Sequence, residues 1–176
     1  MSGRREVVVI GIGNEFRRDD GAGLAVLARL AAALPLEAAR PEVELLASDG
    51  DPAELLAAWA GARLAIVVDA MRGQPPVPGR RHRLDGRQLA ALDQAGAGPW
   101  PASSHGLGLA AAAGLAAALG RLPERLIVHG VEAADLAAGT GLSPAVAAAI
   151  GPLAEAVLAD IQAAGGAAGA PTSGTS

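Results

Sequence analysis

Runs of branched apolar residues, separated by segments with helical spacing, constrain the fold of this 176-residue chain most strongly. Residues 7–12, 64–68 and 126–131 are almost continuously apolar, which is typical of strands covered on both faces of a sheet. Residues 43–47 are a further short strand candidate, and residues 80–84 a possible exposed edge strand. Strands that alternate with helices predict an α/β fold, in which helices cover both faces of a mainly parallel sheet.

The expected helices begin beside acidic, serine or proline residues, which are common at helix starts. Helical spacing follows Asp19-Asp20 as far as Pro35, follows Asp51-Pro52 as far as Trp59, runs from His105 to Leu119 and resumes after Ser143-Pro144. Pro152 should break or kink the last helix, because an interior proline removes a backbone hydrogen bond. We therefore expect one domain over residues 1–164, followed by a disordered tail of small residues over 165–176.

The absence of three residue types limits the chemistry that this chain can perform. It has no cysteine, no tyrosine and no lysine, since all 14 lysine-or-arginine positions are arginine. Disulfides, thiolate metal sites, Schiff bases and lysine-dependent phosphate loops are therefore excluded. The net charge of −4 argues against nucleic acid as a partner. No uncharged apolar run reaches the length of about 18 residues that suggests membrane insertion, and we expect a cytoplasmic monomer.

Acidic and histidine residues follow the predicted strands, where parallel sheets bind their ligands. The loop after the first strand carries Asp19 and Asp20, the third strand ends at Asp69, and His105 precedes a helix. Each of these residues has an ordinary alternative role, as a cap or as a first-turn residue of a helix. Two carboxylates and an imidazole would, however, suit a borderline transition metal such as nickel or zinc.

Other kinds of site fit the sequence less well. A dinucleotide site would need a third glycine where Phe16 stands, and the acidic pair at the helix start would repel a pyrophosphate. A flavodoxin-like nucleotide binder remains an alternative that the absorbance of a bound cofactor would reveal. Ser104 and His105 are adjacent, which disfavours a catalytic triad, and no G-x-S-x-G elbow is present. His82 is expected to be solvated and His129 to be structural.

Six motifs occur in an order that resembles the hydrogenase maturation proteases. They are Gly11-x-Gly13-Asn14, Asp19-Asp20-Gly21-x-Gly23, Val68-Asp69-Ala70, Ser104-His105-Gly106-Leu107-Gly108-Leu109, Gly130-Val131-Glu132 and Leu142-Ser143-Pro144. The resemblance covers roughly residues 7–160 and depends on all the motifs in register. It implies a three-layer fold with a twisted, mainly parallel five-stranded sheet between helices.

The resemblance also implies an endopeptidase that recognises a metal. The family's metal-binding positions correspond to Asp20, where the family often has glutamate, Asp69 and His105. Its members are classed with aspartic-type endopeptidases, which makes Asp20 and Asp69 the candidate catalytic residues. The expected substrate is the nickel-loaded precursor of a [NiFe] hydrogenase large subunit, which loses a C-terminal peptide. Nickel would come with this precursor, and zinc or cadmium is an alternative ion for the resting site.

Asn14, Phe16 and Gly106 lie near the expected cleft and are candidate substrate-binding residues. Two mechanisms stay open: the metal acts on the scissile carbonyl or on water, or it positions the precursor while a carboxylate activates water. The alternative function is a non-catalytic chaperone that binds the nickel-loaded precursor. Cleavage of the precursor by purified protein would separate the two functions.

Overall fold

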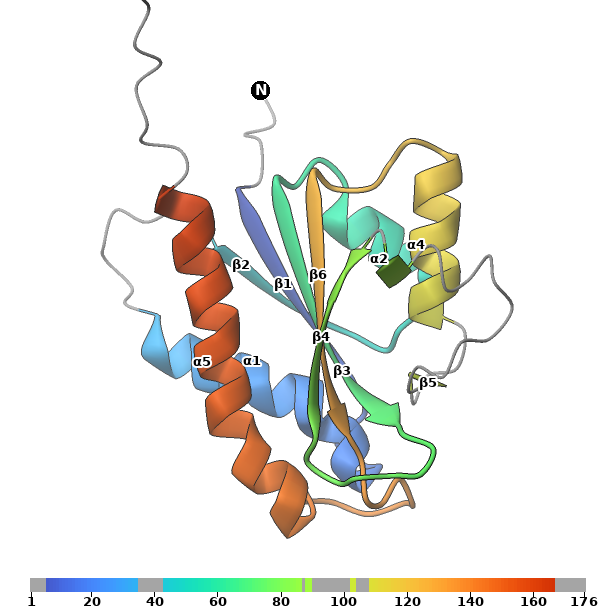
Figure 1. Ribbon diagram of the computed structural model, residues 1–176, viewed down its shortest axis with the longest axis vertical. Helices are drawn as coiled ribbons and strands as arrows, with labels where there is room; N and C mark the ends of the chain where they lie inside the picture. The colour runs from blue at the N-terminus through green and yellow to red at the C-terminus, as the bar shows by residue number, and fades with distance from the viewer. Residues whose placement is uncertain (1–5, 35–42, 87, 90–101, 104–107, 167–176) are drawn as a thin grey trace, which may run out of the picture.

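The computed structural model describes residues 6–34, 43–86, 88–89, 102–103 and 108–166 (Figure 1). Ser104, His105 and Gly106, which the sequence singled out, lie outside these ranges. The part of the expected tail from residue 167 onward also lies outside them.

A mainly parallel sheet forms the centre of the molecule. Its strands are β1 (Val7–Ile12), β2 (Val43–Ser48), β3 (Leu64–Arg72), β4 (Arg81–Asp85), β5 (Ala102–Ser103) and β6 (Arg125–Glu132). They lie in the order β2-β1-β3-β6-β4, and the short β5 pairs with the end of β3. β1, β2, β3 and β6 are parallel, whereas β4 pairs antiparallel with β6 at one edge. The predicted edge strand and the mainly parallel sheet are confirmed.

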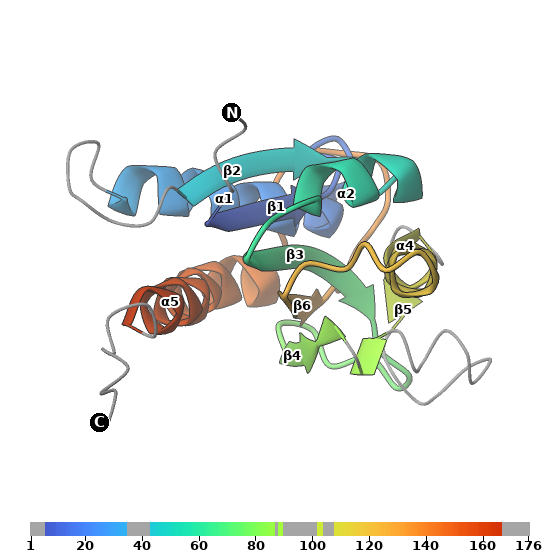
Figure 2. The same ribbon diagram turned by 90° about the horizontal axis from the view of Figure 1, so that it is seen from above.

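Helices cover both faces of the sheet, which confirms the three-layer fold (Figure 2). They are α1 (Ala22–Ala33) and α5 (Pro144–Gly166) on one face, and α2 (Pro52–Trp59) and α4 (Gly108–Ala118) on the other. Successive side chains of β3 point to opposite faces, as in any strand. Ile66 and Val68 belong to the core under α1 and α5, and Ala65 and Val67 to the core under α2 and α4.

Strand β3 extends beyond its predicted end, so Asp69 lies within the strand and not after it. β6 continues the pairing as far as Met71↔Glu132, and β5 pairs with Met71 and Arg72. These partners supply backbone hydrogen bonds to residues 69–72, which follow the apolar run and were not predicted to belong to the strand. As a result Asp69 is fully buried, with 0% of its surface exposed.

The sequence predicted that Pro152 breaks or kinks the last helix, and the structure shows no break, because α5 continues through Pro152. Buried apolar side chains before and after the proline hold the helix against the core; they include Val146, Leu153, Val157 and Ile161. Pro152 itself is exposed, so its ring displaces no packed side chain. The helix also includes Gly165 and Gly166, which the sequence had placed in the tail.

The last helix is long and apolar enough to cross a membrane by length and composition alone. In the structure it packs against α1 and β6. Asp160, on the same helix, forms an ion pair with Arg83 of β4 and a hydrogen bond with His129 of β6. The apolar stripe of α5 is therefore accounted for as part of the core of this domain.

Candidate active site at the carboxyl edge of the sheet

The order of the strands around β1 indicates where a ligand would bind, at the carboxyl edge of the sheet. β1 lies between β2 and β3, and the connections that lead to these strands carry α1 and α2 on opposite faces (Figure 2). β1 leads into α1 on one face, and the chain after β3 returns to the sheet through α4 on the other face. Open parallel sheets bind ligands at the carboxyl edge beside such a change of face. Residues 13–21 follow β1 at this place, and Asp69 lies near the end of β3.

Glycines let the start of α1 approach the ends of these strands closely. A Cβ atom at Gly23 would collide with the carbonyl oxygen of Val68. A Cβ atom at Gly13 would collide with the carbonyl oxygen of Asp20. The 3-10 turn η1 (Arg18–Gly21) is thereby held in contact with β3.

Asp20 and Asp69 are brought to this edge from two different elements. Asp20 belongs to η1, and Asp69 to the strand that η1 contacts. Both residues have 0% of their surface exposed. A buried carboxylate is costly unless it is hydrogen-bonded, protonated or close to a cation. Two of them at one edge of the sheet therefore indicate a functional site.

The third candidate, His105, lies outside the described residues. On one side of it Ser103 belongs to β5, which pairs with the end of β3, and on the other side Gly108 begins α4. Within the part of the chain that the structure describes, no group of three or more histidine and acidic side chains could hold a metal ion. The metal site formed by Asp20, Asp69 and His105 therefore stays a prediction.

Asp19 has a structural role, which distinguishes it from the neighbouring Asp20. Its Oδ2 accepts hydrogen bonds from the backbone N–H groups of Ala134 and Asp135, at 2.8 and 2.9 Å. The backbone N–H and the hydroxyl of Ser143 donate two more, at 2.6 and 2.9 Å. Burial raises the pKa of the Asp19 carboxyl, but these hydrogen bonds outweigh burial and hold the pKa below its ordinary value. Asp19 thus fastens residues 134–143 and, contrary to the alternative drawn from the sequence, does not cap α1.

Glu132 is a buried carboxylate that sequence reasoning did not single out as a site residue. It ends β6, and 1% of its side chain is exposed. The backbone N–H of Val77 donates to its Oε2 at 2.6 Å, and Nε2 of His82 lies 2.8 Å from its Oε1. Burial raises the pKa of Glu132, but the contacts with Val77, His82 and Arg80 outweigh burial and lower it. Its position at the end of a predicted strand could have identified Glu132 as a candidate, because the same criterion identified Asp69.

The sequence suggested that His82 is solvated, and this prediction is wrong. Its side chain is 15% exposed and contacts the buried carboxylate of Glu132. The neighbouring arginines suggested an exposed segment. Side chains of an edge strand alternate between solvent and the sheet face, however, so His82 can be covered while its neighbours are exposed.

His129 has the structural role that the sequence predicted. Its Nε2 lies 2.8 Å from Oδ2 of Asp160 on α5, and the guanidinium of Arg83 contacts the same carboxylate at 2.8 and 3.1 Å. Burial lowers the pKa of His129, so the neutral ring donates its Nε2–H to Asp160. This cluster fastens β4 and β6 to α5.

Comparison with known proteins identifies the family. The family model described as hydrogenase maturation protease matches residues 28–160. The hydrogenase 2 maturation protease of Escherichia coli strain K12 is 31% identical over 160 residues, which span 90% of this chain and 92% of that protein. This chain belongs to the hydrogenase maturation protease family.

Solved structures of hydrogenase maturation proteases have the same fold. The hydrogenase maturating endopeptidase HybD from E. coli is 30% identical with a TM-score of 0.75, over 91% of this chain and 94% of HybD. The [NiFe] hydrogenase maturation protease HybD from Thermococcus kodakarensis is 23% identical with a TM-score of 0.70, over 89% and 99% of the two chains. The predicted family and fold class are confirmed.

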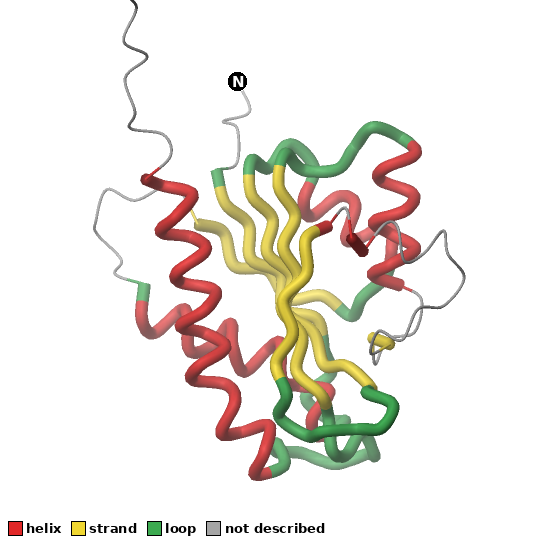
Figure 3. Tube along the Cα trace, viewed as in Figure 1, coloured by secondary structure: helices red, strands yellow, loops and turns green. Residues whose placement is uncertain are grey.

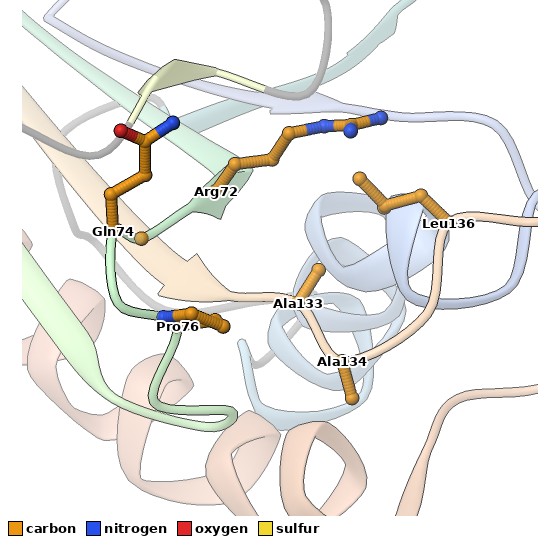
Figure 4. Close-up of a pocket in the computed structure, with 7 residues that line it drawn as sticks. Arg72, Gln74, Pro76, Ala133, Ala134 and Leu136 are labelled. Atoms are coloured by element: carbon orange, nitrogen blue, oxygen red, sulfur yellow. The ribbon is translucent and has the colours of Figure 1, made fainter.

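In this family member a pocket of about 310 Å³ lies at the ends of β3 and β6 (Figure 4). It is lined by Arg72, Gly73, Gln74, Pro76, Ala133, Ala134 and Leu136. The loops over residues 73–80 and 133–143, which supply these walls, follow β3 and β6 and lie at the same end of the sheet (Figure 3).

Asn14 and Phe16, the candidate substrate-binding residues, lie in the loop after β1. Oδ1 of Asn14 accepts a hydrogen bond from the backbone N–H of Phe16 at 2.9 Å. The backbone N–H of Gly139 donates to the Phe16 carbonyl oxygen at 2.8 Å, and 64% of the Phe16 surface is exposed. Contact of these residues with a substrate stays a prediction, as does that of Gly106, which lies outside the described residues.

Proposed function

We propose that this protein is an endopeptidase that removes a C-terminal peptide from the nickel-loaded precursor of a [NiFe] hydrogenase large subunit. The observation that supports this most is the pair of fully buried carboxylates, Asp20 and Asp69, at the carboxyl edge of the sheet in a hydrogenase maturation protease family member. The activity named for the relatives makes a hydrogenase precursor the expected substrate. Action in the cytoplasm and as a monomer are further expectations from the sequence.

In this proposal nickel belongs to the substrate and is recognised by Asp20, Asp69 and His105. Carboxylate oxygens and an imidazole nitrogen are suitable ligands for nickel and for other borderline divalent ions. A set of this size leaves coordination positions for the groups of the precursor that already hold the ion. The protein would therefore recognise the precursor only after nickel has been installed.

We assign proton transfer during hydrolysis to the carboxylates of Asp20 and Asp69. Hydrolysis needs a base that takes a proton from water and an acid that returns a proton to the leaving nitrogen. One carboxylate of the pair takes the proton as the water oxygen bonds to the scissile carbonyl carbon. It gives the proton to the nitrogen as the C–N bond breaks. The enzyme class is accordingly an aspartic-type endopeptidase, in which nickel fixes the position of the precursor.

Incubation of the purified protein with nickel-loaded precursor tests the proposal, with the released peptide identified by mass spectrometry. Asp20→Asn, Asp69→Asn and His105→Ala should each abolish release, while thermal melts show that the variants are folded. Asp49→Asn is the matched control, because Asp49 is an exposed aspartate in the loop after β2, and it should keep the wild-type rate. A folded Asp69→Asn variant that cleaves as fast as the wild type would contradict the assignment.

The alternative function, a chaperone that checks the nickel-loaded precursor, predicts a different result. The purified wild-type protein would then bind the loaded precursor and not the nickel-free one, but the mass of the precursor would stay unchanged.

The isolated protein should bind nickel weakly, because the precursor supplies part of the coordination sphere. Calorimetric titration should give a dissociation constant no tighter than about micromolar. Stoichiometric zinc, cadmium or nickel that survives purification and treatment with a chelator would contradict this part of the proposal.

A further inference from the structure

The pocket at the ends of β3 and β6 carries positive charge. Arg72 is the charged residue among those that line it, and its side chain extends across the pocket toward Leu136 (Figure 4). A second guanidinium, that of Arg17, donates to the backbone carbonyl oxygen of the lining residue Leu136 at 3.4 Å. Within the described chain no carboxylate pairs with Arg72 or Arg17, whereas Arg18 pairs with Asp135 at 3.2 Å.

Two buried carboxylates hold the walls of this pocket in place. Glu132 fastens one wall, where it accepts the hydrogen bond from the backbone N–H of Val77 at 2.6 Å. A Cβ atom at Gly73 would collide with the Glu132 side chain, so this wall packs directly on the carboxylate. Asp19 fastens the other wall through the backbone N–H of Ala134 at 2.8 Å. The pocket is therefore formed in advance, and a ligand need not order its loops on binding.

The pocket is also connected to the proposed catalytic pair. Arg72 follows Asp69 on β3, at about 10 Å along the strand. On the other side, Asp19 holds Ala134 and is the chain neighbour of Asp20. Positions 69 and 72 lie on opposite faces of β3. A polypeptide with its scissile bond at Asp20 and Asp69 would therefore pass around the carboxyl end of β3 and reach the pocket with a residue roughly three or more positions away.

We propose that this pocket binds the carboxylate of an acidic side chain of the precursor, a few residues from the scissile bond. The identity of the ligand as a precursor rests on the proposed function. A guanidinium matches a carboxylate with two parallel hydrogen bonds, and the amide of Gln74 lines the same pocket. The small residues Gly73 and Ala133 leave space for the methylene groups of a glutamate. Arg72 is thus a residue that determines which precursors are accepted.

Direct binding to the full-length protein tests the pocket without any cleavage. The probes are acetylated alanine–glycine peptides: one amidated with a single glutamate, one amidated with glutamine in its place, and one with glutamine and a free terminal carboxylate. Titration followed by NMR reports on the Arg72 Nε–H resonance, which is assigned by its absence in Arg72→Gln. The glutamate peptide should shift this resonance, and the neutral peptide should not. A shift with the free-terminus peptide alone would overturn the proposal of an acidic side chain. Equal responses to all peptides, or no response, would overturn the proposal.

Cleavage of nickel-loaded precursor gives a second readout. Arg72→Gln should raise KM by about tenfold, as expected for the loss of one charge-assisted hydrogen bond, and leave kcat within about twofold. Arg72→Lys should recover part of the loss. Arg121→Gln is the matched control, because Arg121 is exposed in the segment before β6, at the opposite end of the strands. An unchanged KM in folded Arg72→Gln would overturn the proposal.

The two proposals fail in different ways. If the wild-type protein does not cleave the precursor, the endopeptidase assignment is wrong, and the peptide titration still decides whether the pocket binds a carboxylate. If the wild type cleaves but neither KM nor the Arg72 resonance responds, the assignment of the pocket alone is wrong.

Discussion

Adjacent aspartates in η1 have different roles, and the surroundings of each side chain decide the difference. Asp19 accepts hydrogen bonds from a loop that begins 115 positions later in the chain, at Ala134. Asp20 lies in the same turn, which contacts β3, the strand of Asp69, and both residues are fully buried. The sequence could not separate Asp19 from Asp20, because both follow the same strand and precede the same helix. Contacts of such long range are not visible in local patterns.

Asp19→Asn should destabilise the protein more than Asp20→Asn does. An asparagine keeps one acceptor oxygen, but its amide group would face backbone N–H donors that the carboxylate now satisfies. The expected loss is about 1–3 kcal/mol in the free energy of unfolding, measured by urea denaturation. Asp20→Asn serves as the neighbouring control and should instead lose precursor cleavage. Equal stability of the two variants would contradict the structural role of Asp19.

The stability gap between the wild type and Asp19→Asn should also depend on pH. The folded-state pKa of Asp19 lies below its ordinary value of 3.8. The charged carboxylate therefore contributes its full stabilisation above the unfolded pKa of about 3.9 and loses it as the pH falls through the lower folded pKa. Urea denaturation at a series of pH values should show the gap shrinking below about pH 4. A gap that stays constant down to the acid unfolding of the wild type would disprove this linkage.

At the scale of elements, local signals predicted most boundaries and failed where distant partners extended an element. Asp51 caps α2 as predicted, since its side chain accepts hydrogen bonds from the N–H groups of Ala53 and Glu54 at 2.9 and 3.0 Å. β3 is longer than its apolar run because β5 and β6 pair with its last residues. α5 continues through Pro152 because buried residues on both sides of the proline hold the helix to the core. Packing thus outweighed a local helix breaker.

Pro152→Ala should therefore stabilise the protein. The alanine restores a backbone N–H that can donate within α5, and the exposed proline ring has no packing to lose. An increase of about 1–3 kcal/mol in the free energy of unfolding is expected, measured by urea denaturation.

Pro144→Ala is the matched control for this change. Pro144 is the first residue of α5, where a proline costs no helical hydrogen bond and its fixed φ favours the helix. Its replacement should leave stability unchanged or slightly lower. If Pro152→Ala gave the same small effect as Pro144→Ala, the helix would already have relaxed around the proline.

For the whole molecule, the sequence predicted the layers and the mainly parallel sheet. Continuous apolar runs implied strands covered on both sides, and the carboxyl-edge rule then selected Asp69 and the pair after β1. The same rule applied to Glu132 would have found a further buried carboxylate. Its partner His82 could not be predicted, because their contact joins β4 to β6 and depends on the antiparallel register of the two strands. The pocket escaped sequence reasoning because two loops far apart in the chain form it.

Arg63, the residue before β3, contacts both the beginning and the end of the described chain. Its guanidinium forms an ion pair with Glu6, next to β1, at 3.0 Å. It also donates a hydrogen bond to the carbonyl oxygen of Ala164 at 2.6 Å. Ala164 lies in the last turn of α5, where helix carbonyl groups lack partners within the helix. The fold therefore needs the chain as far as Ala164, beyond the last long apolar side chain of α5.

Truncation after Gly166 and truncation after Ala163 should consequently have different effects. The first removes residues of the predicted tail and should change the free energy of unfolding by less than about 0.5 kcal/mol, with precursor cleavage intact. The second also removes the acceptor of the Arg63 hydrogen bond and a residue that is 8% exposed, and should cost about 1–2 kcal/mol. Combining this truncation with Arg63→Ala tests the cause. If both changes remove the same interaction, the loss of unfolding free energy in the double variant is smaller than the sum of the two separate losses. Fully additive losses in urea denaturation would show that Arg63 and Ala164 act independently, and that something other than this contact makes the end of α5 necessary.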